Sequence, residues 1–391
     1  MSEESESAHD EPVARRRSRA RIASRTLLAL CSTTVLALTA VGWFVVDRLG
    51  EVSSAKVIDQ HVAQAPPDDD GATDVLLVGS DSRTDAQGNP LPLRVLKQLR
   101  TEATNGLNTD SLVLIRIPHG SARPTAVSIP RDTYAEIPSG GSEKINAVYG
   151  LTKKTTENSL RDRGVAEDEA EQQAKATGQR ALVQTVQRLT GVRVDHYAEL
   201  NLLGFFELTE AVGGVEVCLN SAVSDKNSGA DFAAGRQTVS GADALSFVRQ
   251  RHGLPRGDLD RIVRQQVFMA GLANKVLSTG TLTDPAKVND LTAAARRTVE
   301  LDEDWDPLGF VQQMQQVATG AVNFVTLPVA DDNARNERGQ SIVVVEPKAA
   351  QRFVAGLTTT APRLAPDPVL RLDGTAKEPP ISSGDEVPCV N

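Results

Sequence analysis

An uncharged run at residues 26–46 is the feature that most constrains what this chain can fold into. Its 21 residues are enough for one helix across a bilayer, which needs about 20. Six arginines lie just before it, at 15–25, and Asp47 and Glu51 follow it. Because basic residues favour the cytoplasmic side of a membrane, the pattern predicts a cytoplasmic N-terminus and an extracellular bulk.

A cleaved signal peptide is the alternative interpretation of this N-terminus. The apolar run is long for a signal peptide, and Leu38-Thr39-Ala40 is a poor cleavage site. We therefore expect a single-pass protein of the cell membrane that keeps its anchor. The predicted segments are a cytoplasmic basic tail at 1–25, a transmembrane helix at 26–46, an extracellular linker at 47–73, a folded domain at 74–357 and a flexible tail at 358–391.

The composition argues against a nucleic-acid-binding protein. The net charge of −9 opposes binding to a phosphate backbone, and aromatic residues, at 4%, are too few for base-stacking platforms. No cysteine–histidine cluster has the spacing of a zinc site. Of the three cysteines, Cys31 lies in the predicted span, whereas Cys218 and Cys389 would face an oxidising exterior. They form either a disulfide that ties down the C-terminal tail or two free thiols.

The stretch at 241–266 contains five arginines within 16 residues. An extended segment at 247–251 would place two of them on one face of a strand, and a helix beginning at Asp258 would place two more, with a glutamine, on one helical face. Arginine binds phosphate oxygens in pairs, so the pattern predicts a pyrophosphate clamp. The alternative is a solvated face with ion pairs to Asp258 and Asp260. The side chains expected to converge are Arg249, Arg251, Arg261, Arg264 and Gln265.

Three apolar runs, at 74–79, 111–117 and 125–129, predict three strands. If they form an antiparallel meander, the end of the first, the start of the second and the end of the third share one edge of the sheet, where ligands often bind. Two carboxylates there would suit Mg²⁺, or another divalent ion such as Mn²⁺, together with waters and phosphate oxygens. Each could instead be a turn or cap residue. The polar side chains of this edge are Asp81, Arg83, Asp110, Arg131 and Asp132.

Three further segments bear on the same site. Lys144 follows a Gly-Gly turn and adds a candidate phosphate ligand. The polar segment at 153–177 predicts an exposed helix, with a mobile cover over the site as the alternative. The Leu- and Phe-rich residues at 202–208 would form either core or the wall of a slot for an apolar tail.

Five blocks, in order along the chain, resemble the LytR-CpsA-Psr family of cell-envelope proteins. The segment at 196–217 also resembles the central part of that family, and the resemblance covers 74–269, with a weaker extension to 357. The five blocks are LLVGSDSR (76–83), NTDSLVLI (108–115), SIPRDTY (128–134), KINAVYG (144–150), and GADALSFVRQRH (241–252) with DLDRIVRQQ (258–266).

The resemblance implies an α/β fold, a three-layer α-β-α sandwich around a central mixed sheet, behind one N-terminal transmembrane helix. It implies an extracellular catalytic domain at 74–357 that moves a glycopolymer from a polyprenyl-pyrophosphate carrier to peptidoglycan and releases polyprenyl phosphate. Carried over by motif, Asp81 and Asp110 would hold Mg²⁺. The side chains that would bind the pyrophosphate are Arg83, Arg131, Lys144, Arg249, Arg251, Arg261 and Gln265.

The expected chemistry is phosphoryl transfer, in which a peptidoglycan hydroxyl, by resemblance the muramic acid 6-hydroxyl, attacks the sugar-bearing phosphorus. Catalysis would depend mostly on positioning and charge neutralisation. Asp81, Asp110 or Asp132 could accept the proton, although pairing with a metal or an arginine makes a carboxylate a weaker base. We expect Asp132 to orient Arg131 and Arg83 instead. The predicted catalytic side chains are Arg131, Arg249, Arg251 and Asp132.

Two other functions fit the same residues. A lipid pyrophosphate hydrolase would need the same clamp and metal, with water as the nucleophile, although the chain has no histidine-rich catalytic set. A non-catalytic regulator would bind envelope polymers or phospholipids without chemistry. Products of the reaction distinguish these alternatives from the transferase.

Overall fold

The computed structural model describes part of the chain. The predicted basic tail and transmembrane helix lie outside the described residues, within which no helix is both long and apolar enough to cross a membrane. The chain separates into a unit at 1–51 and a unit at 52–391, and everything described belongs to the second. The described residues are 53–55, 57–58, 66–67, 69–85, 88–102, 107–120, 122–277, 286, 289–291, 293–294, 299–303, 305, 322–358, 381–382 and 387–391.

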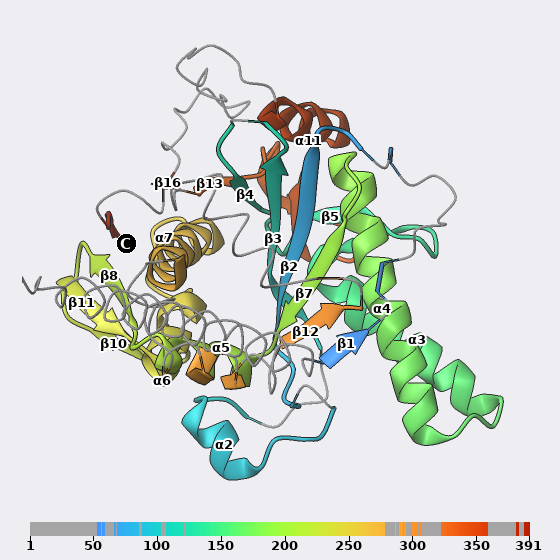
Figure 1. Cartoon of the computed structure of the whole chain (residues 1–391), viewed down its shortest axis with the longest axis horizontal. Coiled ribbons are helices and arrows are strands. Elements are labelled where there is room, and N and C mark those ends of the chain that lie inside the picture. The colour runs from blue at the N-terminus through green and yellow to red at the C-terminus, as the bar shows by residue number, and fades with distance from the viewer. Residues whose placement is uncertain are drawn as a thin grey trace, which may run out of the picture. The chain divides into compact units, whose positions relative to one another are not determined.

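A mixed sheet of eight strands forms the centre of this part of the chain (Figure 1). Its middle is an antiparallel meander of β2 (Ala72–Ser80), β3 (Thr109–Pro118) and β4 (Thr125–Ser128), which confirms the three predicted strands. Parallel neighbours flank the meander, and the outer strands complete the sheet. These are β7 (His196–Leu200), β12 (Val299–Asp302) and β1 (Ser53–Ala55) beyond β2, and β13 (Asn323–Thr326) and β16 (Ile381–Ser382) beyond β4.

Helices cover both faces of the sheet because its central strands are apolar on both sides. Leu76 and Leu114 belong to a core shared with α3 (Ile145–Asp162), α4 (Glu167–Thr190) and α11 (Pro347–Ala355). On the opposite face, Val75 and Ile115 pack with Ala270 of α7 (Asp258–Leu277). Figure 1 shows α7 on one side of the sheet and α3 and α4 on the other. The arrangement is the expected α-β-α sandwich.

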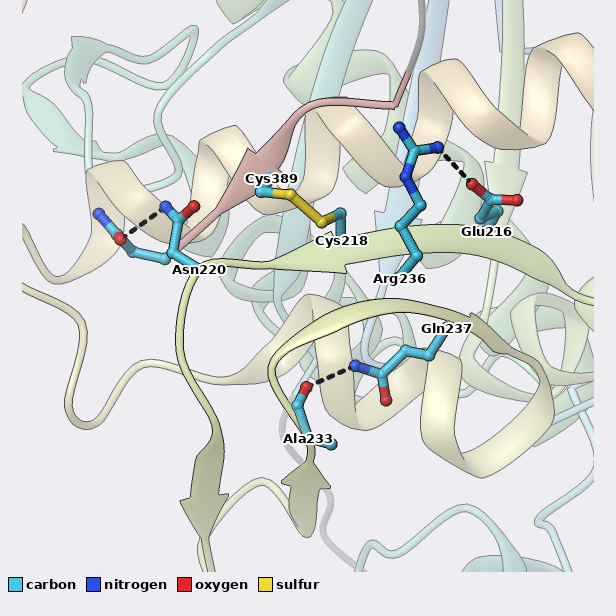
Figure 2. The surroundings of a disulfide bond; sticks show 8 residues. Glu216, Cys218, Asn220, Ala233, Arg236, Gln237 and Cys389 are labelled. Carbon is cyan, nitrogen blue, oxygen red and sulfur yellow. Dashed lines mark hydrogen bonds and ion pairs between the residues drawn. A yellow bond between two sulfur atoms is a disulfide. The ribbon is translucent and has the colours of Figure 1, made fainter.

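A second, smaller core joins α7 to a three-stranded sheet of β11, β8 and β17. Phe247 and Phe268 lie at its centre. A disulfide between Cys218 of β8 and Cys389 of β17 fixes the last strand of the chain (Figure 2), so the disulfide alternative is the correct one. The elements of this region are α5 (Leu202–Ala211), β8 (Val215–Leu219), β9 (Val223–Asp225), β10 (Ala230–Phe232), β11 (Gly235–Val239), α6 (Gly241–Arg249) and β17 (Cys389–Val390).

The remaining elements lie around the rim of the main sheet. The short helix α2 (Leu93–Gln98) packs through Leu96 against Leu202 and Leu245. Two β-hairpins and a short helical turn complete the described part: β5 (Tyr134–Glu136) with β6 (Ser142–Lys144), β14 (Asp331–Arg335) with β15 (Ser341–Val344), and η1 (Gly356–Thr358).

Two sequence-based expectations about local structure need correction. Residues 247–249 do not begin a strand: α6 continues to Arg249, because Ala244, Leu245 and Phe247 are buried at helical spacing. The polar segment at 153–177 forms two helices rather than one, since Gly164, with φ of 78°, turns the chain between α3 and α4. Most side chains of this hairpin are exposed or half-buried, as predicted, and it has a small core of its own.

The ends of the predicted folded domain also carry structure. Within the predicted linker, residues 53–55 form β1, and Val57, 1% exposed, joins the main core. Within the predicted tail, Val390 is buried in the smaller core. Segments on both sides of 74–357 therefore contribute to the fold.

Candidate active site

The candidate site lies at one edge of the central sheet, as the meander predicts. Because β3 runs antiparallel to both neighbours, the end of β2, the start of β3 and the end of β4 meet. Asp81 follows β2, Asp110 is the second residue of β3, and Arg131 and Asp132 follow β4. Lys144 joins them from the end of β6. The structure therefore brings together the sheet-edge residues selected from the sequence.

The connection between α6 and α7 brings the second group of arginines to this edge. Arg249, the last residue of α6, donates a hydrogen bond to the carbonyl of Leu99 at 3.1 Å. Arg261 lies in the first turn of α7 and is 3% exposed. Burial and the charge of Arg83 hold the pKa of Arg249 below its usual value, and burial does the same for the pKa of Arg261 against the opposing effect of Asp258.

Asp258 pairs with more arginines than any other carboxylate of the site, whereas the sequence predicted only the start of a helix and local ion pairs there. Its Oδ1 atom lies 3.0 Å from Nη2 of Arg261, 3.4 Å from Nη2 of Arg251 and 3.9 Å from Nε of Arg131. One carboxylate oxygen thus faces three guanidinium groups that come from three separate segments. The available signal was its position between Arg251 and Arg261 in sequence.

The other carboxylates of the site each hold one or two cations. Asp110 is hydrogen-bonded to Arg131, whose pKa is raised by Asp110, Asp132 and Asp258 in spite of burial. Asp132 lies 3.8 Å from Nε of Arg131 and 3.1 Å from Nζ of Lys144. Asp132 therefore pairs with Arg131, as predicted, but its second partner is Lys144 and not Arg83.

Arg83 finds its partner in its own loop. One guanidinium nitrogen lies 3.0 Å from the carboxylate of Asp81 and also donates to the Asp81 carbonyl. The other terminal nitrogen donates to Oγ1 of Thr101 at 3.3 Å. This local pairing competes with the one expected from Asp132.

The site as a whole has more positive than negative charge. Six cationic groups face four carboxylates, which leaves a surplus of two positive charges. Several buried guanidinium nitrogens make no hydrogen bond: Nε of Arg83, Arg131 and Arg261, and Nη2 of Arg251. Buried donors without acceptors are costly, so they mark a place for an anion. The ten charged groups are Arg83, Arg131, Lys144, Arg249, Arg251 and Arg261 with Asp81, Asp110, Asp132 and Asp258.

A pocket between α7 and the β3–β4 edge adjoins this charge cluster. Its cavity volume is small, about 10 Å³. Gln265, whose amide donates to the carbonyl of Val248 at 3.3 Å, lines this pocket. Both polar and apolar residues line the pocket. Its polar lining is Asp110, Ser111, Ser128, Arg131, Arg261 and Gln265, and its apolar lining is Leu112, Val113, Ile129, Ile262 and Met269.

Arg264 does not belong to the clamp, which corrects the expectation of four converging arginines from this stretch. Its side chain is fully buried, donates to the Gln250 side chain and to the Asn391 carbonyl, and lies 5.2 Å from the ring centre of Phe247. Burial lowers the pKa of Arg264 to about 10. Arg264 therefore holds the C-terminal strand in place, while Arg261, one turn earlier, faces the pocket.

The carboxylates fit a divalent cation only in company with other oxygen ligands. Within the described residues, no three His, Cys, Asp or Glu side chains form a group that could hold a metal. Asp81 accepts a hydrogen bond from the Asn108 amide at 2.7 Å and pairs with Arg83, while Asp110 pairs with Arg131. Mg²⁺ commonly takes one or two carboxylates plus waters and phosphate oxygens, which is the donor set that Asp81, Asp110 and a bound pyrophosphate would supply.

Comparison with known sequences identifies the class of cell-envelope protein to which this fold and this site belong. Residues 47–357 match the sequence model of the LytR_cpsA_psr family. The chain therefore belongs to the LytR-CpsA-Psr family.

Individual relatives agree with this membership. The chain is 45% identical over 379 residues to the cell wall biosynthesis protein LcpA of Corynebacterium glutamicum, covering 94% of this chain and 71% of that protein. It is 28% identical over 250 residues to TagU of Oceanobacillus iheyensis, named a polyisoprenyl-teichoic acid–peptidoglycan teichoic acid transferase, covering 64% and 70%.

Solved structures support the fold. A LytR-Csp2A-Psr enzyme from Actinomyces oris has a TM-score of 0.52 at 16% identity, covering 79% of this chain and 96% of that one. TagV of Bacillus subtilis gives 0.52 at 19%, covering 74% and 96%.

Proposed function

We propose that this protein is an extracytoplasmic phosphotransferase that moves a glycopolymer from a polyprenyl-pyrophosphate carrier to peptidoglycan. The observation that carries the proposal is the cluster of Arg131, Arg251 and Arg261 around Asp258 beside a pocket with an apolar wall. Membership of the family, in which relatives are named transferases of teichoic acid to peptidoglycan, identifies the kind of reaction.

The substrate suits both halves of the site. The pyrophosphate would accept hydrogen bonds from the unpaired guanidinium donors and replace part of their pairing with carboxylates. The first units of the polyprenyl chain would widen the pocket and lie against Val113, Ile262 and Met269, the apolar lining on the α7 side of the sheet. A water-soluble nucleotide sugar would leave that wall without a partner.

The reaction then requires one bond exchange. The acceptor hydroxyl of peptidoglycan attacks the sugar-bearing phosphorus, the bond to the bridging oxygen breaks, and polyprenyl phosphate leaves with the electron pair. Arg131, Arg249 and Arg251 neutralise charge on the phosphate oxygens, and their fixed positions avoid reorganisation during the reaction. The hydroxyl proton passes to a carboxylate of the sheet edge, Asp81, Asp110 or Asp132, or to water. Asp132 also positions Arg131 and Lys144.

Mg²⁺ or Mn²⁺ would be held by Asp81 and Asp110 and would supply additional neutralisation of phosphate charge. The predicted helix at 26–46 would anchor the enzyme in the cell membrane, with the catalytic domain outside, where the carrier lipid and peptidoglycan meet. Both features are expectations from the sequence and from the family resemblance.

The proposal is tested with the full chain in detergent, Mg²⁺, a short polyprenyl-pyrophosphate oligosaccharide and peptidoglycan fragments, with mass spectrometry of the products. We expect the oligosaccharide joined to the acceptor through one phosphate. Free sugar phosphate without an adduct would identify a hydrolase instead. Tight lipid binding with no product from a panel of donors would identify a binding regulator.

A further inference from the structure

The short helix α2 is attached directly to the candidate active site. The carbonyl of Leu99, just after the helix, accepts the hydrogen bond from Arg249, and Thr101 accepts one from Arg83. Arg100 donates to the carbonyl of Gly229 and to Ser246, and pairs with Asp243 at 2.8 Å. Figure 1 shows α2 beyond the end of the sheet that carries the site. Whatever α2 contacts is therefore close to the clamp and held at a fixed position relative to it.

The helix has two contrasting faces. Leu96 is buried in a cluster with Leu202 and Leu245. On the outside, Leu93 is 71% exposed, the higher of the two values among exposed large hydrophobic side chains in the described residues. Arg94 and Lys97 are exposed beside it, and the helix contains no acidic residue. A protruding leucine flanked by two cations, in a chain with net charge −9, matches an anionic lipid surface.

The path of the chain into the fold indicates which end of the molecule can approach a bilayer. β1 is parallel to β12, and β12 is antiparallel to β7, so β1 runs opposite to β2. Ser53 is paired in register, through Glu300 and Glu199, with Val78 near the end of β2. The first residue of β1 therefore lies at the site end of the sheet.

Only residues 47–52 separate this strand from the predicted membrane helix. Seven steps along an extended chain span at most about 25 Å. If 26–46 crosses the bilayer, Ser53 at the site end of the sheet must stay within that distance of the lipid surface. The opposite end, with the β3–β4 turn, can lie farther away by about the length of the strands.

We propose that Leu93, Arg94 and Lys97 form a membrane-docking surface for anionic phospholipid, which holds the mouth of the site at the lipid interface. Leu93 inserts among the acyl chains near the headgroups, and Arg94 and Lys97 contact lipid phosphates. Three side chains bind weakly on their own, but the anchor keeps them at a high local concentration of lipid. Docking would place the clamp where the pyrophosphate of a membrane-embedded carrier lies. The inference builds on the proposed function but does not need turnover to be tested.

The first test measures depth rather than activity. The full chain carrying Leu93→Trp is reconstituted in vesicles of zwitterionic lipid with about one third anionic phosphatidylglycerol, with and without lipids brominated near the headgroup. We expect bromination to remove about half of the fluorescence that the new tryptophan adds to the parent signal. The matched control, Arg123→Trp at the exposed β3–β4 turn, should lose none.

Charge reversal supplies an independent test. Arg94→Glu with Lys97→Glu should abolish the quenching of Trp introduced at position 93. The same pair should reduce transfer from a long-chain carrier embedded in the vesicles by about tenfold, and leave transfer from a short, water-soluble carrier unchanged. Equal quenching at positions 93 and 123, or equal loss with both carriers, would overturn the docking surface. Quenching at 93 without any transfer would leave docking intact and count against the proposed function alone.

Discussion

The two ends of the central sheet contain charge clusters of opposite balance. At the site end, six cationic side chains face four carboxylates, and buried guanidinium nitrogens lack acceptors. At the other end, Arg116 and Asp74, each 1% exposed, form an ion pair that also includes Asp70 at 2.8 Å from Arg116. Asp195 accepts a hydrogen bond from the Asp74 amide at 2.8 Å. Here the carboxylates outnumber the arginine.

The two imbalances are resolved in different ways. A carboxylate can take up a proton, and burial raises the pKa of Asp74 to about 7, in spite of Arg116. A guanidinium group keeps its proton near neutral pH, so surplus arginines can be neutralised only by an anion from outside. The acidic end can therefore balance its charge by taking up a proton, although Asp74 Oδ1 and Arg116 Nε lack hydrogen-bond partners there too, whereas the cationic end can balance its charge only with a ligand. This difference separates a structural ion-pair cluster from a binding site better than the number of charges does.

The largest expected effect on activity comes from replacing a clamp arginine by lysine, which removes the planar, two-pronged guanidinium group. Arg249→Lys or Arg251→Lys keeps the charge but cannot reproduce paired contacts with phosphate oxygens, so kcat/KM for transfer should fall by about 100-fold, or roughly 3 kcal/mol. Thermal stability should change little. The control is Arg236→Lys, in an exposed ion pair with Glu216 at 2.9 Å (Figure 2), which should keep full activity. Unchanged turnover in both clamp variants would exclude these arginines from phosphate binding.

Arg264 is an arginine of α7 whose contacts stabilise the fold and do not reach the clamp, so its replacement should affect stability and not ligand binding. Arg264→Met should lower the free energy of unfolding by roughly 2–3 kcal/mol, since it leaves Gln250 and the Asn391 carbonyl without their buried donor. Chemical denaturation measures this loss. The KM for the carrier, measured well below the unfolding temperature, should match the parent protein. A raised KM with full stability would return Arg264 to the clamp.

Some parts of the fold and site are encoded in local sequence patterns, and others depend on packing between distant segments. The strands β2 to β4 are apolar runs separated by turns, and their antiparallel order alone brings Asp81, Asp110 and Arg131 to one edge. That part of the site depends on local signals. The prediction of an extended segment at 247–251 was wrong because packing decides the structure there. The ring of Phe247 fills the core beside Phe268, and this keeps the chain helical up to Arg249.

The sequence also did not predict ion pairs and hydrogen bonds between residues that are far apart along the chain. Spacing along a helix places Arg261 and Arg264 on neighbouring positions, but only the tertiary structure shows that one reaches Asp258 and the other reaches the C-terminus. The Asp74–Arg116 pair is 42 residues apart in sequence and lies inside apolar runs, so no local pattern marks it. Family resemblance supplied the clamp residues but not these contacts.

The acidic end predicts a pH dependence of stability with a definite sign. The pKa of Asp74 is raised in the folded protein above the roughly 4 expected for an unfolded chain, so the folded state binds the proton more tightly. Its contribution to stability is full below pH 4 and is lost as the pH rises through 7. Relative to Asp74→Asn, which cannot titrate, the parent should therefore lose roughly 3–4 kcal/mol between pH 4 and 8, at about 1.4 kcal/mol for each pH unit by which the pKa is raised. Denaturation curves of both proteins across this range measure the difference, and parallel curves would show that Asp74 stays ionised throughout.

The smallest effect is expected from removing one negative charge from the end that already has a surplus of positive charge. Asp258→Asn removes the carboxylate that faces three arginines, so the full chain should bind inorganic pyrophosphate about threefold to tenfold more tightly at low ionic strength, and less so as salt is added. Asp231→Asn, an exposed position on β10, changes the net charge equally and serves as the control in calorimetric titrations. Equal tightening in both variants would mean that overall charge, and not the clamp, sets the affinity. Weaker pyrophosphate binding in Asp258→Asn alone would mean that Asp258 positions the arginines more than it competes with the anion. The surplus positive charge would then bind the anion only while this carboxylate holds the three guanidinium groups together.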